Sequence, residues 1–253
     1  MPLSLVFFAL GAIIASFVGL VVARLYSGAS IAQGRSRCDA CGSTLPALHL
    51  VPIFSWFWLR GRCGSCGSRV SPFSTLSEVI LGSLYVLAYA KLGLTLALLF
   101  FLIALALLLA IVLYDLAHTI VPSVFLYPFL AVSICFALVA NTSTATPLAI
   151  LYVALGIGGS LLLLHLISRG RAMGFADAPL ALGLSLLVGS AAFSGFIFSF
   201  WIGAVVGIII LSGRPRGHRM GIEVPFAPFL VAGFLLAYFT QWDPFVLIGM
   251  LLP

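Results

Sequence analysis

Long apolar stretches recur along this 253-residue chain, and they limit its fold more than any other feature of the sequence. Their lengths of roughly 17 to 25 residues are what an α-helix needs to cross the hydrocarbon core of a membrane. The composition agrees, because 63% of the residues are hydrophobic and only 7% are charged. We therefore predict an all-α polytopic membrane protein with about eight transmembrane helices, the sixth short enough to be tilted or buried against its neighbours. The expected spans are residues 3–22, 75–90, 94–113, 121–140, 147–167, 178–190, 193–211 and 225–239.

The arginine residues occur in alternate loops between these spans. With about eight spans, the loops after the first, fifth and seventh lie on one face of the membrane, and the positive-inside rule makes that face cytoplasmic. Both termini are then expected on the opposite side. The net charge of +6 reflects this concentration of arginines in the loops of one face, and it gives no reason to expect nucleic acid as a partner. Membrane lipid is expected as a partner. The arginines in these loops are Arg24, Arg35, Arg37, Arg60, Arg62, Arg69, Arg169, Arg171, Arg214, Arg216 and Arg219.

A polar loop of residues 25–72 separates a first transmembrane helix (residues 1–24) from a transmembrane core (residues 73–253), which gives three predicted regions. The loop contains two CxxC pairs, each followed by a glycine that lets the turn curl. Each pair can offer two thiolates from one tight turn, so the pattern predicts a tetrahedral zinc site with a structural role. Two disulfides are the alternative, but the arginines place the loop in the reducing cytosol, which favours zinc. The predicted ligands are Cys38, Cys41, Cys63 and Cys66.

Other residues that stand out are interpreted more simply. The apolar and aromatic run of residues 50–59 lies between the cysteine pairs, where it can pack on the metal-binding turns or enter the membrane interface. Cys135, alone in the fourth span, is expected to be a small core residue, and Glu78, early in the second span, is expected to have a structural role. The four histidines have no partner at ligand spacing, although His118, one helical turn after Asp115, can influence that carboxylate.

Asp115 and Asp177 stand where an apolar stretch meets a short polar turn. The predicted topology puts both at the cytoplasmic boundary, because Asp115 ends the third span and Asp177 opens the sixth. An ionisable residue at membrane depth is costly, which makes it a candidate for function. Two carboxylates that can meet at one depth indicate a pair that shares a proton, the chemistry of an aspartic protease. For either residue alone, a helix cap or an interhelical hydrogen bond is the alternative.

The motifs around these residues, in their order along the chain, resemble those of the type IV prepilin peptidases, which are intramembrane aspartic proteases of the GxGD type. The resemblance extends from about residue 11 to residue 230. It implies a bacterial inner-membrane endopeptidase that removes the basic leader peptide from prepilins and pseudopilins at the cytoplasmic face, for pilus assembly or secretion. It also implies that Asp115 and Asp177 are the catalytic pair. The motifs are the twin CxxCG loop and residues 113–122, 173–180 and 224–230.

A second activity is implied by the same resemblance. Many relatives with the cysteine loop also methylate the new N-terminal residue, using S-adenosylmethionine as the methyl donor. No methyl-donor motif is recognisable in this sequence, so this activity and its cofactor rest on analogy.

Four positions depart from the family pattern, and neither aspartate is among them. Ala176 stands for the second glycine of the Gly-x-Gly-Asp motif, and Pro179 stands where the family has lysine. Gly19 and Ser123 replace residues that are commonly polar in relatives. The departures at Ala176 and Pro179 make a catalytically impaired relative, which binds pilins or assists assembly, one alternative function. A proton-coupled transporter that uses Asp115 and Asp177 in a proton relay is another alternative. The transporter predicts acidic residues near midspan and inverted repeats, and neither is evident.

Overall fold

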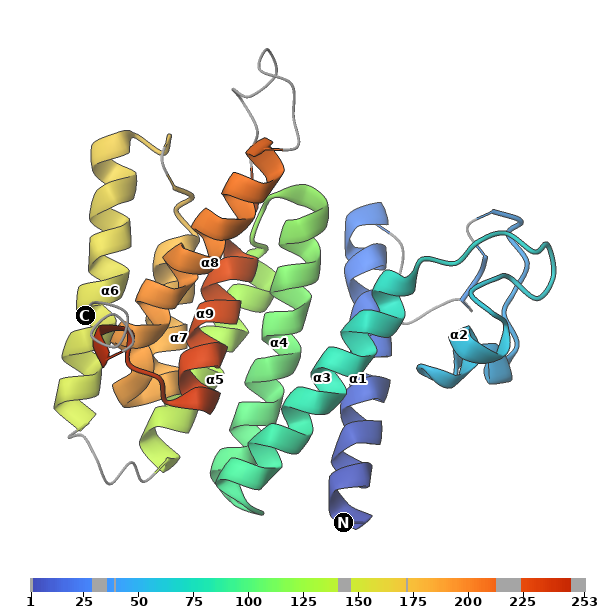
Figure 1. The fold of residues 1–253 in the computed structure, drawn as a ribbon, viewed down its shortest axis with the longest axis horizontal. Coiled ribbons are helices and arrows are strands. Elements are labelled where there is room, and N and C mark those ends of the chain that lie inside the picture. Colours follow the sequence, from blue (N-terminus) through green and yellow to red (C-terminus); the bar gives the residue numbers. More distant parts are fainter. Residues whose placement is uncertain are drawn as a thin grey trace. The chain divides into compact units, whose positions relative to one another are not determined.

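The structure is a computed structural model that describes residues 2–28, 36–38, 40–140, 147–171, 173–212 and 224–246. These residues are mostly helical and form no strand beyond two isolated β-bridges, so the all-α prediction is confirmed for them. In chain order (Figure 1), the elements are α1 (Pro2–Ser27), η1 (Ala47–Leu50), α2 (Phe54–Trp58), α3 (Pro72–Leu92), α4 (Leu96–His118), α5 (Ser123–Val139), α6 (Pro147–Ser168), α7 (Asp177–Val188), η2 (Gly189–Ala191), α8 (Ala192–Ser212) and α9 (Ala227–Thr240).

Each predicted span coincides with one of the longer helices. Within the described ranges, five helical segments are long and apolar enough to cross a membrane: α1, α3, α4, α6 and the run Asp177–Ile210, which joins α7 to α8. α5 and α9 are apolar but shorter. The chain is thus a multi-pass helical membrane protein, whereas eight crossings and a cytoplasmic face for the arginine loops stay predictions. Of the arginines that support this orientation, four lie outside the described residues: Arg35, Arg214, Arg216 and Arg219.

The chain divides into two compact units, Met1–Leu98 and Leu99–Pro253. In the first unit α1 packs along α3. Two glycines allow this contact, because a Cβ on Gly11 would lie 2.8 Å from the Gly82 Cα, and a Cβ on Gly82 would lie 2.9 Å from the Phe8 carbonyl oxygen. Small residues of this kind let membrane helices approach closely. The three regions predicted from the sequence stay a prediction.

α7 forms the centre of the second unit, where it packs against α5, α6, α8 and α9. Ten of its 12 residues are buried, as expected for a short sixth span enclosed by its neighbours. Gly189, at φ +64°, ends α7, and η2 leads into α8. α8 and α9 lie in close contact, because a Cβ on Gly233 would come 2.6 Å from the Ser199 Cα. This packing fixes the positions of the first residues of α7 and α9 relative to each other within the second unit.

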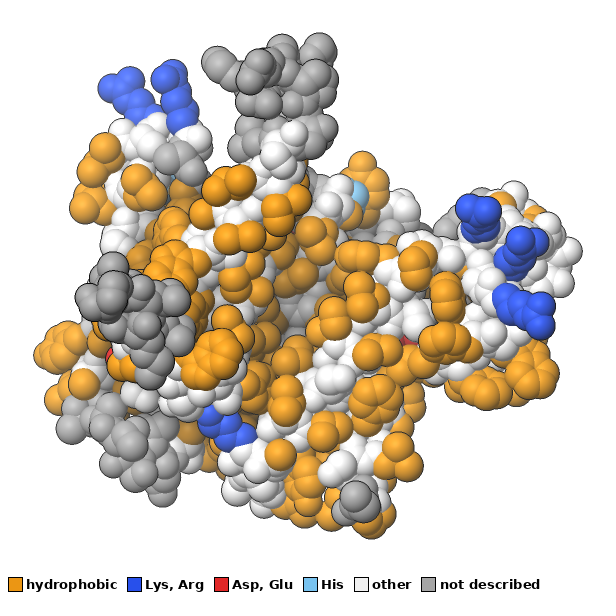
Figure 2. Space-filling model, viewed as in Figure 1, with side chains coloured by type: hydrophobic (Ala, Val, Ile, Leu, Met, Phe, Trp, Pro, Cys, Tyr) orange, Lys and Arg blue, Asp and Glu red, His pale blue; other side chains and the backbone are white. Residues whose placement is uncertain are grey.

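Apolar side chains cover the outward flanks of the helices (Figure 2). Leu5 on α1, Leu138 on α5 and Ile167 on α6 are among the most exposed of them. In water such surfaces would promote aggregation, but they suit contact with lipid chains. Cys135 on α5 is also exposed, so the expectation that it belongs to the core is wrong. In a membrane helix the lipid-facing and core-facing sides are both apolar, so composition does not distinguish them.

Candidate active site and metal centre

Asp115 lies in the last turn of α4 and is buried, with 4% of its surface exposed. Its Oδ2 accepts a hydrogen bond of 3.2 Å from the backbone N–H of Ala227. Ala227 opens α9, so this N–H is one of the donors that no carbonyl within the helix can satisfy. A carboxylate at this point also meets the positive end of the helix dipole. α4 is held against α9 because Phe101 stacks on Tyr238, with ring centroids 4.8 Å apart.

Asp177 is the first residue of α7 and is also buried, with 6% of its surface exposed. Its Oδ2 accepts a hydrogen bond of 3.1 Å from the Gly174 N–H, and its own N–H donates to the Gly174 carbonyl at 3.4 Å. These two bonds close a tight turn immediately before the helix. A glycine suits the first position, because an added Cβ would lie only 3.3 Å from Asp177 Oδ2. The turn therefore holds the Asp177 carboxylate at the start of α7.

Two departures from the resembled motif lie in or next to this turn. Ala176 has φ −70° and ψ −18°, a conformation that any L-residue adopts, so the backbone does not require glycine there. Pro179 lies in the first turn of α7, where a backbone N–H has no carbonyl partner in the helix and proline is tolerated. Neither residue strains the backbone that carries Asp177.

The structure brings Asp115 and Asp177 together within the second unit. They come from different helices, and their carboxylates are close enough to interact electrostatically. In each, Oδ2 is engaged by a backbone N–H, which leaves Oδ1 for water or substrate. Two like charges in largely apolar surroundings cannot easily both ionise, so the arrangement suits a pair that shares one proton.

His165 is a residue near this pair that the sequence reasoning missed. Its Nδ1 lies 2.9 Å from the Met173 carbonyl oxygen, and its ring meets the Phe175 ring edge-on, with centroids 5.7 Å apart. It also interacts electrostatically with the Asp177 carboxylate. His165 on α6 thus holds the segment that leads into the Asp177 turn. No spacing rule could identify it, because the contact depends on how α6 packs beside α7.

Of the other histidines, His49 and His118 lie in the described part of the chain and do not belong to its metal-binding group. The ring of His118 meets Tyr114 edge-on at 4.7 Å between centroids, and its influence on the neighbouring aspartate stays a prediction. His49 lies beside the second cysteine turn, and His218 lies outside the described residues. Over the part of the chain that the structure describes, the four predicted cysteines form the only group able to hold a metal ion.

The two CxxC pairs form turns of the same design. In the first turn the Gly42 N–H donates to the Cys38 carbonyl at 2.8 Å, and in the second the Gly67 N–H donates to the Cys63 carbonyl at 2.9 Å. An isolated antiparallel bridge closes the base of each turn. Gly42 and Gly67 have φ of +69° and +71°, a region that L side chains rarely adopt. The glycine after each pair therefore does allow the turn to curl, as the sequence predicts.

The sulfur atoms of these turns converge, and we call the four residues Cys38, Cys41, Cys63 and Cys66 the cysteine cluster. All four Sγ atoms lie within 4.8 Å of one another, and the Cys38 and Cys66 Sγ atoms are 3.9 Å apart. Zinc bonded to sulfur at about 2.3 Å in a tetrahedron requires sulfurs about 3.8 Å apart. A disulfide would require about 2.05 Å. The cysteine cluster therefore fits a metal ion such as zinc better than it fits two disulfides.

Hydrogen bonds around the cysteine cluster stabilise the thiolate form that binds a metal. The backbone N–H groups of Cys41 and Ala40, followed by the Ser68 hydroxyl, lower the pKa of Cys38 to about 6. A thiolate is both the better metal ligand and the better nucleophile. The turns therefore prepare at least this sulfur for metal binding near neutral pH.

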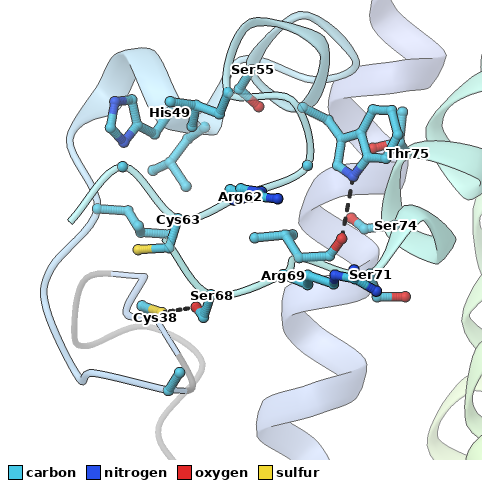
Figure 3. Close-up of a pocket in the computed structure, with 18 of the residues that line it drawn as sticks. Cys38, His49, Ser55, Arg62, Cys63, Ser68, Arg69, Ser71, Ser74 and Thr75 are labelled. Carbon is cyan, nitrogen blue, oxygen red and sulfur yellow. Dashed lines mark hydrogen bonds between the residues drawn. The ribbon is translucent and has the colours of Figure 1, made fainter. Parts of the chain in front are cut away.

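Beside the cysteine cluster, the first unit contains a cavity of about 520 Å³ (Figure 3). Both cysteine turns, α2 and the first turns of α3 line it. Glu78 of α3 lies buried in its wall, where Oε2 accepts a 2.7 Å hydrogen bond from the Ile53 N–H. Ile53 has φ +62°, which is rare for a β-branched residue, and the bond to Glu78 holds it there. Glu78 thus has the structural role expected from the sequence.

Comparisons with known proteins agree with this geometry. Residues 9–92 match a family model described as the bacterial peptidase A24 N-terminal domain, and residues 101–211 match one described as the type IV leader peptidase family. A prepilin leader peptidase/N-methyltransferase of Bacillus subtilis (strain 168) is 30% identical over 246 residues, which cover 92% of this chain and 92% of that protein. The chain belongs to the type IV leader peptidase family.

Two further members of the leader peptidase family carry the same name as the Bacillus protein. The one from Myxococcus xanthus (strain DK1622) is 31% identical over 220 residues, which cover 85% of this chain and 65% of that protein. The one from Legionella pneumophila is 31% identical over 224 residues, which cover 81% of this chain and 72% of that protein. No solved structure matches the chain significantly. The resemblance recognised from the motifs is therefore confirmed.

The two family matches divide the chain much as the site geometry does. The N-terminal match contains the cysteine cluster, and the leader peptidase match contains both Asp115 and Asp177. The unit that holds the carboxylate pair is therefore the one that matches the peptidase part of the leader peptidase family.

Proposed function

We propose that this protein is a membrane-embedded aspartic endopeptidase that removes the leader peptide from prepilins and pseudopilins. The observation that carries the proposal is the pair of buried carboxylates, Asp115 and Asp177, which interact electrostatically from separate helices. Both lie in the region that matches the type IV leader peptidase family. Membership of a peptidase family makes a proton-coupled transporter or an inactive relative the less favoured reading.

The chemistry follows from one proton shared between two carboxylates. The charged carboxylate takes a proton from a water molecule, and that water attacks the carbonyl carbon of the scissile peptide bond. The neutral carboxylate donates its proton to the carbonyl oxygen, and a proton then passes to the leaving amine. The Ala227 and Gly174 N–H groups each hold Oδ2 of one aspartate, which orients the two carboxylates for these steps. The two aspartates act as one unit, and neither is assigned as the base.

The location proposed for this reaction is the boundary of the bacterial inner membrane. We place eight helices across the membrane, with the arginine loops and the ends of α4 and α7 that carry the aspartates on the cytoplasmic side. A prepilin presents a basic leader there, followed by a long apolar helix, so its cleavage site falls at the depth of the pair. The cysteine cluster is assigned a structural zinc, because four thiolates leave no open position on a tetrahedral ion.

Cleavage of a purified prepilin in detergent tests the catalytic pair. Asp115→Asn and Asp177→Asn preserve the size of each side chain and an oxygen that can accept the N–H bond, but they cannot share a proton. Each should abolish leader removal without changing the helical content measured by circular dichroism. Asp243→Asn is the matched control, because Asp243 is exposed and only caps the Phe245 N–H. Cleavage that persists in either pair variant would eliminate the two-carboxylate mechanism.

N-methylation of the new N-terminus is a second activity that the cavity beside the cysteine cluster supports. Its volume of about 520 Å³ lies within the range of small-molecule sites. S-adenosylmethionine has an adenine ring, ribose hydroxyls and a carboxylate, and the cavity offers an indole ring, several hydroxyls and guanidinium groups that suit them. When bound, this cofactor would supply the methyl group. Residues that would hold it are Trp56, Arg62, Ser71, Ser74 and Thr75, of which the last four are labelled in Figure 3.

Binding of labelled S-adenosylmethionine to the purified protein tests this assignment. Arg62→Ala removes a charge from the cavity and should weaken binding by about tenfold, the effect of losing one charge-assisted contact. Arg60→Ala is the control, because Arg60 is exposed and does not line the cavity. Equal binding by the two variants would place the methyl donor elsewhere, and leader cleavage by both should be unchanged.

A further inference from the structure

The cysteine loop exposes an apolar surface that its metal-binding turns do not use. We call its four main residues the aromatic patch: Leu48, Phe54, Phe57 and Trp58 are 79%, 60%, 65% and 74% exposed. None of the five residues of α2 is buried. Large apolar side chains gathered on a short polar loop are unfavourable in water and mark a surface that contacts something apolar. In Figure 2 apolar side chains gather at the lower edge of the loop, directly below the lowest of its arginine side chains.

The position of α2 along α3 indicates what that apolar material is. The bond between the Ile53 N–H and Glu78 Oε2 ties the start of α2 to the seventh residue of α3. At 1.5 Å per residue, this point lies about 9 Å inside α3 from its first residue. α3 is apolar and long enough to span a membrane, and Leu76 and Ile80 of its early turns are exposed. The start of α2 therefore lies beside the early turns of α3, close to exposed apolar side chains that suit contact with lipid.

A second contact fixes which face of α2 points outward. The Trp56 Nε1–H donates to the Val70 carbonyl at 3.4 Å, and its ring packs so closely on Gly61 that an added Cβ would lie 3.1 Å away. Trp56 is thereby turned into the loop. Phe54, Phe57 and Trp58 follow the three- and four-residue spacing of one helix face, which is left on the outside.

We propose that the aromatic patch inserts into the lipid interface of the membrane beside α1 and α3, and so anchors the cysteine loop to the bilayer surface. Tryptophan and phenylalanine favour that depth, where a ring can contact acyl chains below the headgroups. The charge of the loop is complementary, because its exposed arginines attract anionic headgroups. These arginines are Arg37, Arg60, Arg62 and Arg69. The anchoring goes beyond peptidase activity and does not depend on it.

Depth-dependent fluorescence quenching of the full-length protein in phospholipid vesicles tests this anchoring. The chain has 4 tryptophans. Trp56→Phe, Trp201→Phe and Trp242→Phe together leave Trp58 as the single fluorophore. Its emission should be blue-shifted relative to tryptophan in water. It should be quenched most strongly by lipids that carry bromine on the first carbons of the acyl chain, rather than near the chain end.

A protein with Trp56 as its single fluorophore is the matched control. Its fluorophore lies two residues earlier on the same helix, and the Trp56 ring faces the loop, so it should be quenched clearly less than Trp58. Emission of Trp58 at the wavelength of exposed tryptophan, or equal quenching of the two, would overturn the proposal. So would a Trp58 signal that changes with protein density in the vesicles, since that would indicate a second copy on the patch. Circular dichroism of both proteins verifies that the phenylalanine substitutions leave the helices intact.

Discussion

The contact between α8 and α9 offers a direct test of how helix packing supports the carboxylate pair. A Cβ on Gly233 would lie 2.6 Å from the Ser199 Cα, and closer still to the Ser199 backbone nitrogen. Ordinary contacts of a Cβ begin at 3.4 Å, so Gly233→Ala must separate the two helices by roughly 1 Å. The obstacle is backbone, which cannot rotate away as a flexible side chain can.

The expected cost has two parts. Overpacking of a tight contact costs about 1–3 kcal/mol. The separation also stretches the contact from the Ser199 hydroxyl to the Leu230 carbonyl, now 3.2 Å. This part adds little, because the same hydroxyl keeps its shorter, 2.8 Å bond to the Gly195 carbonyl within α8. We therefore expect the free energy of unfolding to fall by about 1–3 kcal/mol. Cleavage should fall as well, because α9 begins with the Ala227 N–H that holds Asp115.

Thermal unfolding in detergent and prepilin cleavage, measured on the same preparations, test both parts. Gly203→Ala is the matched control, because it lies on the same pair of helices and its Cβ would meet the Phe229 side chain at an ordinary 3.5 Å. This control should unfold and cleave like the wild type. A Gly233→Ala protein that is as stable and as active as the control would show that the close contact does not support the site.

The remaining predictions concern the first unit and the approach to the carboxylate pair. Gly11→Ala should loosen α1 from α3 and lower the unfolding temperature, whereas Gly19→Ala, with open space around it, should not. Removal of the metal with a chelator should make the cysteine loop more sensitive to protease, while leader cleavage continues. A loop that resists protease equally well before and after chelation would argue against a structural metal. In the chelated protein, iodoacetamide should modify Cys38 rapidly near neutral pH and slowly below about pH 6. The reason is that the lowered pKa keeps this thiol ionised above about pH 6, and the thiolate is the reactive form. A modification rate that rises only in alkaline solution would contradict this. His165→Leu loses the contact with the Met173 carbonyl and should slow cleavage several-fold, and His165→Asn, which can still donate to that oxygen, should recover part of the rate.

The helices, the cysteine turns and the candidate aspartates could be predicted because each depends on local properties of the chain. A long apolar run in a membrane has to satisfy its backbone hydrogen bonds internally, so its length alone predicts a helix. Two cysteines and a glycine at fixed spacing form the same turn in both pairs, whatever surrounds them. Asp115 and Asp177 could be selected because each is a rare charge at the end of an apolar run.

The contacts that assemble these parts are long-range, and the pattern of apolar residues does not encode them. Asp115 accepts its hydrogen bond from Ala227, which is 112 residues away, and Glu78 holds Ile53 from 25 residues away. His165 reaches the segment before Asp177 only because α6 packs beside α7. In a water-soluble protein the buried face of a helix can be recognised from the sequence, because the opposite face is polar. In a membrane protein both faces are apolar, so the sequence does not distinguish them. The amino-acid sequence thus determined which segments are helices and which residues can do chemistry, and the tertiary structure decided which of their faces meet.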